Sequence, residues 1–251
     1  MLITRRLCIL ALIALAAAAG VMGDDSEESS IEDSYLQEAI EMMIIRETSR
    51  AGSLEQKEIA LEYIGNAIER GNNNDEIRNT LEYLALEGVQ NRSRENGRIT
   101  NNFPTVRRQA AKYLGDMGTP EAQASLIKIM RNENEPMVLQ EAIKSLGNVD
   151  SENADAAVAT IVHIVNEFNA KNPDNMLALS AVDALDKIAQ KNKGITDGSA
   201  FQLLTTIAAG NYIRPVQERA KQVLMNLYKY AASDKKQKED QQKKQQQQKQ
   251  Q

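Results

Sequence analysis

Hydrophobic residues recur along most of the chain three or four positions apart, which is the spacing of amphipathic helices. No segment shows a convincing strand-like alternation of polar and apolar positions. Glycine and proline interrupt the pattern where helices are expected to end and begin, as in Gly118-Thr119-Pro120. The pattern predicts helices at residues 35–48, 54–70, 75–87, 104–117, 120–131, 136–148, 153–168, 174–191, 198–209 and 213–230.

One short motif recurs in every second predicted helix. An apolar residue, an alanine and a leucine stand four positions apart and therefore share one helix face. The clear copies are Val106, Ala110 and Leu114; Val138, Ala142 and Leu146; Leu177, Ala181 and Leu185; and Val216, Ala220 and Leu224, with a fainter one at Ala60 and Ile64. The five alanines are separated by 50, 32, 39 and 39 residues. The chain is therefore a tandem array of helix pairs, with a polar insertion at 88–102.

A helix pair of this length cannot be stable by itself. Ordering the chain costs roughly 1.5 kcal/mol per residue, whereas burying a large apolar side chain contributes only about 2 kcal/mol. Each pair must share its core with the next, so the fold class is all-α and the architecture is an α-solenoid of about five antiparallel helix pairs.

The segment PTVRRQAAKYLGDMGTPEAQASLIKIM, residues 104–130, resembles a HEAT repeat of the short variety first described in phycobilin lyases. EPMVLQEAIKSLGNV and IRPVQERAKQVLMNL match the same pattern more loosely, and the resemblance covers about 35–231. It implies a right-handed superhelix in which the helices that carry the alanine motif line the concave side. In this family the arginine after the valine contacts a neighbouring repeat, which gives Arg107 a structural role. Its counterparts are Lys57, Leu139, Ala178 and Gln217, so we do not expect a continuous polar ladder.

Both ends of the chain differ from the helical array. Residues 1–23 have a positive start, an apolar run and small residues at the end, which is typical of a secretory signal peptide. An uncleaved anchor is the alternative, although the apolar run is shorter than the ~20 residues of a spanning helix. We expect an acidic disordered leader at 24–34, the solenoid at 35–231, and a Lys/Gln-rich tail at 232–251 that is disordered or forms a fraying helix.

Composition excludes several functional classes. The formal charge of −5, the pI near 5.2 and the absence of tryptophan argue against nucleic-acid binding, which needs a basic face. His163 is the single histidine and Cys8 the single cysteine, so we predict no metal site, no cofactor and no catalytic residues. We interpret His163 as a partly buried helix residue.

A binding surface is the better prediction. Positions two residues before and after each motif alanine should face solvent on the concave side. Candidate contacts there are Arg108, Lys112 and Lys144, which form a small basic spot, together with Asp183 and Glu218. The insertion adds Arg92, Arg94 and Arg98, and long loops of this kind often carry function.

These observations favour an exported, non-enzymatic scaffold that binds a protein partner of the cell envelope, in the periplasm or outside the cell. Membrane contact is expected only through an uncleaved signal or the basic tail. One alternative is a structural subunit whose ends stack on other subunits. Another is a chromophore-handling protein like the lyases, although a shared repeat by itself says little about activity. The sequence specifies neither the partner nor the oligomeric state.

Overall fold

The structure is a computed structural model that describes residues 31–150, 154–171 and 173–248. The chain divides into two compact units, Met1–Met42 and Met43–Gln251. In the first unit, the described residues are 31–42, which form the N-terminal part of helix α2 (Ile31–Arg50). The predicted signal peptide and residues 24–30 of the predicted leader lie outside the described residues, and residues 31–34 form the first turn of α2.

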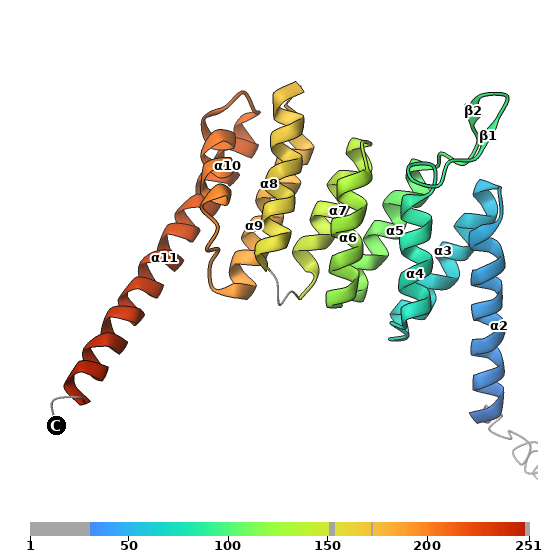
Figure 1. The fold of residues 1–251 in the computed structure, drawn as a ribbon, viewed down its shortest axis with the longest axis horizontal. Coiled ribbons are helices and arrows are strands. Elements are labelled where there is room, and N and C mark those ends of the chain that lie inside the picture. Colours follow the sequence, from blue (N-terminus) through green and yellow to red (C-terminus); the bar gives the residue numbers. More distant parts are fainter. Residues whose placement is uncertain (1–30, 151–153, 172, 249–251) are drawn as a thin grey trace, which may run out of the picture. The chain divides into compact units, whose positions relative to one another are not determined.

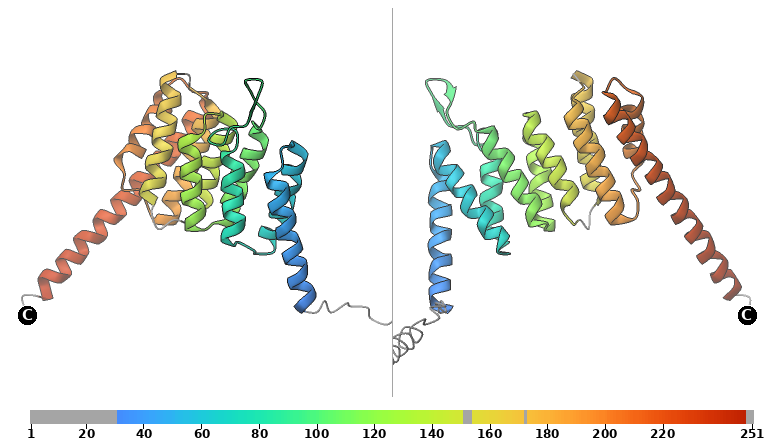
Figure 2. Two further views of the ribbon diagram at one scale, coloured as in Figure 1. Left: turned by 45° about the vertical axis from the view of Figure 1, so that its right-hand side comes forward. Right: turned by 180° about the vertical axis from the view of Figure 1, so that it is seen from behind.

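The second unit is an array of helix pairs arranged in two layers (Figure 1). The outer layer consists of α4 (Asp75–Leu86), α6 (Pro120–Asn132), α8 (Ala154–Lys171) and α10 (Gly198–Ala209). The inner layer consists of α3 (Leu54–Glu69), α5 (Pro104–Met117), α7 (Pro136–Asn148), α9 (Asn175–Asn192) and α11 (Arg214–Gln248). Each inner helix contacts the inner helices of the adjacent pairs, and the right-hand view of Figure 2 shows this layer from behind. The predicted all-α solenoid of consecutive helix pairs is confirmed.

Local sequence explains where these helices begin. The side chains of Ser53, Asn74 and Thr119 accept hydrogen bonds from the backbone amides of Gln56, Ile77 and Ala122, which otherwise lack an acceptor in the first turn. Proline occupies the first position of α5, α6 and α7, where its missing N–H costs nothing. Gly118 ends α5 in the left-handed conformation, with φ of 67°.

The motif alanines lie at the centre of the array. Ala60, Ala110, Ala142, Ala181 and Ala220 are all fully buried. Their small side chains allow neighbouring helices to approach closely, and isoleucine, leucine and valine fill the space around them. The core is therefore aliphatic, as the composition predicts.

The inner helices approach one another more closely than the outer helices do. A Cβ atom added at Gly115 of α5 would lie 2.5 Å from the Cβ of Ser145 in α7. A Cβ added at Gly147 of α7 would lie 2.9 Å from the Cα of Ala184 in α9. Inner neighbours also contact each other more extensively than outer neighbours do.

The structure differs from the sequence prediction at the insertion. Residues 88–102, expected to be an irregular loop, contain a short antiparallel hairpin of β1 (Arg94–Glu95) and β2 (Arg98–Ile99). Asn96 and Gly97 connect the strands, both with positive φ, the geometry of a two-residue hairpin turn. Figures 1 and 2 show this hairpin projecting past the end of the neighbouring helix α4.

The last helix is also longer than predicted. It was expected to end at residue 230, before a disordered or fraying tail, but α11 continues through the Lys/Gln-rich segment to Gln248. Lysine, glutamine and glutamate are good helix formers, and no glycine or proline interrupts the segment.

Candidate protein-interaction surface

The predicted basic spot is exposed on the inner layer. The side chains of Arg108, Lys112 and Lys144 are 52%, 45% and 58% exposed. The first two lie one helical turn apart on α5, and the third lies on α7, which packs directly against α5. The structure therefore presents these three cations to solvent on two neighbouring inner helices, as the motif spacing predicts.

Carboxylates accompany each of these cations. Glu141 of α7 is 3.6 Å from Nε of Arg108 and 3.4 Å from Nζ of Lys144. Asp116 accepts a hydrogen bond of 2.6 Å from Lys112, and this bond raises the pKa of Lys112. Three positive and two negative charges leave the cluster at 3 − 2 = +1. The surface is therefore a mixed-charge network and is less basic than the cations alone indicate.

The two predicted acidic contacts are also engaged within the chain. Asp183 of α9 accepts a 2.7 Å hydrogen bond from Nε of Arg219 in α11, whose Nη2 donates to the buried Asp186. Glu218 accepts a 2.8 Å hydrogen bond from Arg214, one turn earlier on the same helix. Asp183 thus helps to join α9 to α11, while both carboxylates keep about half of their surface in contact with solvent.

The arginines of the insertion lie away from the basic spot. In the hairpin Arg94 pairs with Ile99 and Arg98 pairs with Glu95, and both arginines are exposed. Arg92 precedes the hairpin, and its Nε donates a 2.8 Å hydrogen bond to the carbonyl oxygen of Val89. The structure therefore places the eight predicted contact residues in separate regions, along the inner layer and on the insertion.

A buried ion pair joins consecutive repeats at the position the family resemblance indicates. Arg107 of α5 donates a 2.6 Å hydrogen bond to Glu133, the C-cap residue that follows α6. Both side chains are at least 96% buried. Its Nη1 also donates to Asn102 at 2.7 Å. Oε1 of Glu133 accepts hydrogen bonds from the backbone amides of Asn134 and Glu135, which precede α7. Arg107 is thus structural, as expected, whereas its neighbour Arg108 is exposed.

A second buried ion pair between repeats was not expected. Lys57 of α3 occupies the position that Arg107 has in α5. Its Nζ lies 2.6 Å from a carboxylate oxygen of Glu87, the C-cap residue that follows α4. Lys57 is fully buried and also donates to the carbonyl of Ser49. The lysine could have been recognised as a substitute for arginine, because both supply a cation on a long stem. At the equivalent positions of α7 and α9, Leu139 and Ala178 are buried apolar residues, whereas Gln217 of α11 donates a 2.8 Å hydrogen bond to the carbonyl of Gly210, which caps α10.

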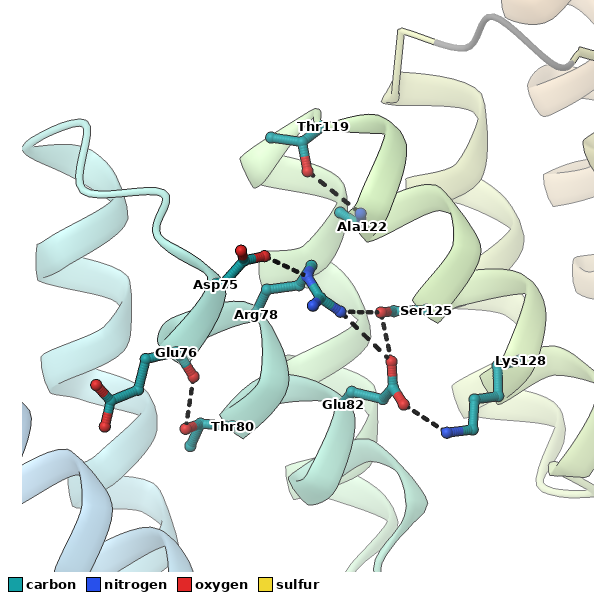
Figure 3. Close-up of polar contacts among 9 residues, drawn as sticks. All are labelled: Asp75, Glu76, Arg78, Thr80, Glu82, Thr119, Ala122, Ser125 and Lys128. Atoms are coloured by element: carbon teal, nitrogen blue, oxygen red, sulfur yellow. Dashed lines mark hydrogen bonds and ion pairs between the residues drawn. The ribbon is translucent and has the colours of Figure 1, made fainter.

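The outer layer is tied together by a polar cluster between α4 and α6. Figure 3 shows Arg78, Glu82, Ser125 and Lys128 pointing toward one another from the two helices. Ser125 donates to Glu82 at 2.5 Å, Lys128 donates to Glu82 at 2.6 Å, and Arg78 donates to Ser125 at 3.2 Å. Burial by itself would raise the pKa of Glu82, but the hydrogen bonds from Lys128 and Ser125 and the charges of Lys128 and Arg78 lower it.

His163 differs from its predicted environment. Its side chain is 69% exposed, and Nε2 lies 3.9 Å from Glu167 on the next turn of α8. The apolar residues Ile161, Ile164 and Val165 occupy the buried face of α8, which leaves residue 163 on the opposite side. In the part of the chain that the structure describes, no three histidine, cysteine, aspartate or glutamate residues form a group able to hold a metal ion. No helix in those same residues is long and apolar enough to cross a membrane.

Comparison with known proteins supports the repeat assignment. Residues 97–167 match the family model of HEAT repeats. The matched segment contains α5 to α7 and most of α8, and includes Arg107, Glu133 and the basic spot. No curated protein and no solved structure matches the chain. Residues 97–167 are therefore similar to HEAT repeats, and they form part of the all-α solenoid.

Proposed function

We propose that this protein is a non-enzymatic scaffold that binds a protein partner along the exposed side of its inner layer. HEAT repeats commonly mediate interactions between proteins. The observation that carries the proposal is the charged face of α5 and α7, where Arg108, Lys112 and Lys144 stand on helices that form a shared core.

The face is rigid because its supporting residues are buried. The Arg107–Glu133 pair holds α5 against the start of α7, and the contact of Gly115 with Ser145 fixes the distance between the two helices. A preorganised face loses little conformational entropy on binding. A mixed arrangement of charges favours selectivity and association rate more than affinity. The partner surface that fits is one with charges complementary to this network.

We further propose that the protein is exported and acts in the cell envelope or outside the cell. The support is the N-terminal sequence alone, with its arginine pair, apolar run and small residues before an acidic segment. Export is tested by fractionating cells that express the full chain and measuring the N-terminal residue by mass spectrometry. A mature chain that begins near Asp24 supports the proposal, whereas full-length chain in the cytoplasmic fraction contradicts it.

Crosslinking in cells followed by mass spectrometry tests the binding surface. We expect crosslinks from Lys112 or Lys144 to a single protein partner. A double variant, Arg108→Glu with Lys144→Glu, reverses two charges on the inner layer, and capture of that partner should fall about tenfold, equivalent to about 1.4 kcal/mol. The matched control is Arg131→Glu with Lys229→Glu, which reverses two exposed charges outside the face of α5 and α7, one on α6 and one on α11.

The two variants together decide the proposal. Loss of capture by the inner-layer variant with retention by the control variant supports a binding face on α5 and α7. Equal capture by both variants and the unmodified chain contradicts it. Circular dichroism and thermal unfolding establish that each variant is folded, which we expect because all four substituted side chains are exposed.

A further inference from the structure

A hollow of about 300 Å³ opens where the root of the insertion meets the end of α2 and the side of α4. It lies at a distinct place from the basic spot, and all of its residues belong to the second unit. Its polar walls include Arg50, Tyr83, Arg92, Ser93 and Thr100.

These walls offer mainly hydrogen-bond donors. Within the described residues, neither Arg50 nor Arg92 forms an ion pair with an acidic side chain. The hydrogen bond from Nε of Arg92 to Val89 fixes that guanidinium and leaves its two terminal nitrogens for another acceptor. Burial, followed by the charge of Glu87, raises the pKa of Tyr83, so the phenol stays protonated and able to donate. The chemistry that complements this set is an anionic oxygen group.

One carboxylate, Glu87, also lines the hollow, but its charge is already compensated. Lys57 lies 2.6 Å from one oxygen of Glu87, and the amide of Asn101 donates to the other at 3.3 Å. The Lys57 ammonium is fully buried behind the wall. Counting Lys57, Glu87 and the two arginines, the hollow carries 3 − 1 = +2 charges.

The hollow is preformed because the root of the insertion is fixed. The side chain of Asn101 donates a 2.7 Å hydrogen bond to the carbonyl oxygen of Asn91. It also accepts a 2.9 Å hydrogen bond from the backbone amide of Ser93. Gly88 has φ of 75° and lies against the backbone of Asn101 and Asn102, where a larger residue would not fit. Binding in such a site requires little ordering of the chain.

The positively charged region continues beyond the hollow along the hairpin, which carries the exposed Arg94 and Arg98, with Glu95 as the acidic residue between them. A second hollow of about 570 Å³, between the end of α2 and α4, shares Arg50 and Tyr83 with the first, but its other cation, Arg46, is paired with Glu76 and adds no net charge. A small free anion would use only the central part of this region, whereas an extended chain with several carboxylates would use all of it.

We propose that this hollow binds an acidic segment of a protein partner, with a side-chain carboxylate held between Arg50 and Arg92. The proposal rests on the proposed function, because it specifies the chemistry of the partner that the scaffold binds. A nucleic acid fits less well, since Tyr83 is the sole aromatic residue in the hollow and base stacking needs several such platforms. The site on the insertion then acts as a second contact, separate from the inner layer.

The test measures binding of a fluorescein-labelled octaglutamate peptide to the full chain by fluorescence anisotropy, near physiological ionic strength. The double variant Arg50→Gln with Arg92→Gln should bind the peptide at least about tenfold more weakly. The matched control, Arg131→Gln with Lys229→Gln, removes the same charge from exposed positions on α6 and α11 and should stay within about threefold of the unmodified chain. Tyr83→Phe keeps the ring, removes the hydroxyl, and should produce a smaller loss.

Each other outcome overturns the proposal. Equal weakening by the control variant would mean that net charge alone attracts the peptide. Unchanged binding by the Arg50 and Arg92 variant would place the contact elsewhere. Stronger binding of a phosphoserine peptide, inorganic phosphate or a single-stranded oligonucleotide, competing for the same arginines, would replace the carboxylate with a phosphate ligand.

The inner-layer variant Arg108→Glu with Lys144→Glu separates this inference from the proposed function. It should lose the crosslinked partner yet bind octaglutamate as the unmodified chain does. Loss of both in that variant would place the acidic segment on the inner layer and would overturn the site on the insertion.

Discussion

At the scale of single residues, adjacent side chains of the sequence have opposite environments. Arg107 is buried against Glu133, whereas Arg108 is half exposed on the inner layer. The family pattern predicts this difference, because one residue of helix turns the side chain by about 100°. Substituting Arg107 therefore tests stability, whereas substituting Arg108 tests binding.

Replacing Arg107 with leucine should destabilise the protein by roughly 3 kcal/mol, because Glu133 would keep a buried charge without its cation. Leucine is an informative choice, since α7 already has Leu139 at the equivalent position. Urea unfolding followed by circular dichroism measures the change.

The comparison variant for this prediction is Lys112→Met, which removes an exposed pair one turn apart and should cost less than about 0.5 kcal/mol. Adding Glu133→Gln to Arg107→Leu should recover part of the lost stability. If Arg107→Leu and Lys112→Met cost the same, burial of the ion pair has no energetic consequence and the prediction is wrong.

Glu82 gives a pH-dependent prediction at the same scale. Its pKa is lowered in the folded protein, so the ionised form is favoured by folding. Its contribution is complete above the ordinary glutamate pKa of about 4.3 and disappears as the pH falls through the lower folded value. Thermal unfolding of Glu82→Gln should show a Tm loss near pH 7 that becomes smaller as the pH falls below about 4.

Glu121 provides the control for this pH series, because it is an exposed glutamate in the first turn of α6, outside the polar cluster. Glu121→Gln should change the Tm much less across the same range. A Tm difference for Glu82→Gln that is constant with pH would contradict the assignment.

At the scale of elements, the distance between inner helices depends on individual glycines. Replacing Gly115 with alanine should lower stability by about 1–3 kcal/mol, because the new methyl group would meet the backbone and side chain of Ser145 in α7. This outcome is informative, since alanine is otherwise the better helix former by about 1 kcal/mol.

Gly52→Ala is the comparison, because no atom lies within 4 Å of the added Cβ and Gly52 does not have a positive φ. It should be neutral or slightly stabilising in thermal unfolding. A stabilising effect of Gly115→Ala would show that α5 and α7 can separate without cost.

The insertion shows what local patterns can miss at this scale. Residues 88–102 have too few apolar residues to predict a strand, yet Asn96-Gly97 is the strongest short signal for a two-residue hairpin turn. Its strands contain only two residues each, so periodicity could not detect them. The anchoring of the insertion by Glu87 and Asn101 depends on contacts across the fold.

At the scale of the whole molecule, stability is shared between neighbouring pairs. Central helices such as α7 contact inner neighbours on both sides, whereas α11 has one inner neighbour, α9. Hydrogen exchange measured by mass spectrometry should therefore show greatest protection in α5, α7 and α9 and least in α11 after residue 231. Uniform protection across all helices would instead indicate one fully cooperative unit.

The class of fold and the residues of its core follow from the pattern of the sequence alone. The alanine motif predicts helices, their apolar faces and the need for stacking, because a four-residue spacing is a local property and one pair cannot bury enough surface alone. The same spacing correctly placed Arg108, Lys112 and Lys144 on an exposed face.

Which charged side chains meet depends instead on how the helices pack. Three ion pairs join residues 30 to 36 positions apart: Glu141 with Arg108, Glu87 with the buried Lys57, and Asp183 with Arg219. Such pairs depend on the register between neighbouring helices, which small differences in side-chain packing set and which no single-helix pattern contains. For the same reason, the hollow between Arg50 and Arg92 exists only once α2, α4 and the insertion have come together.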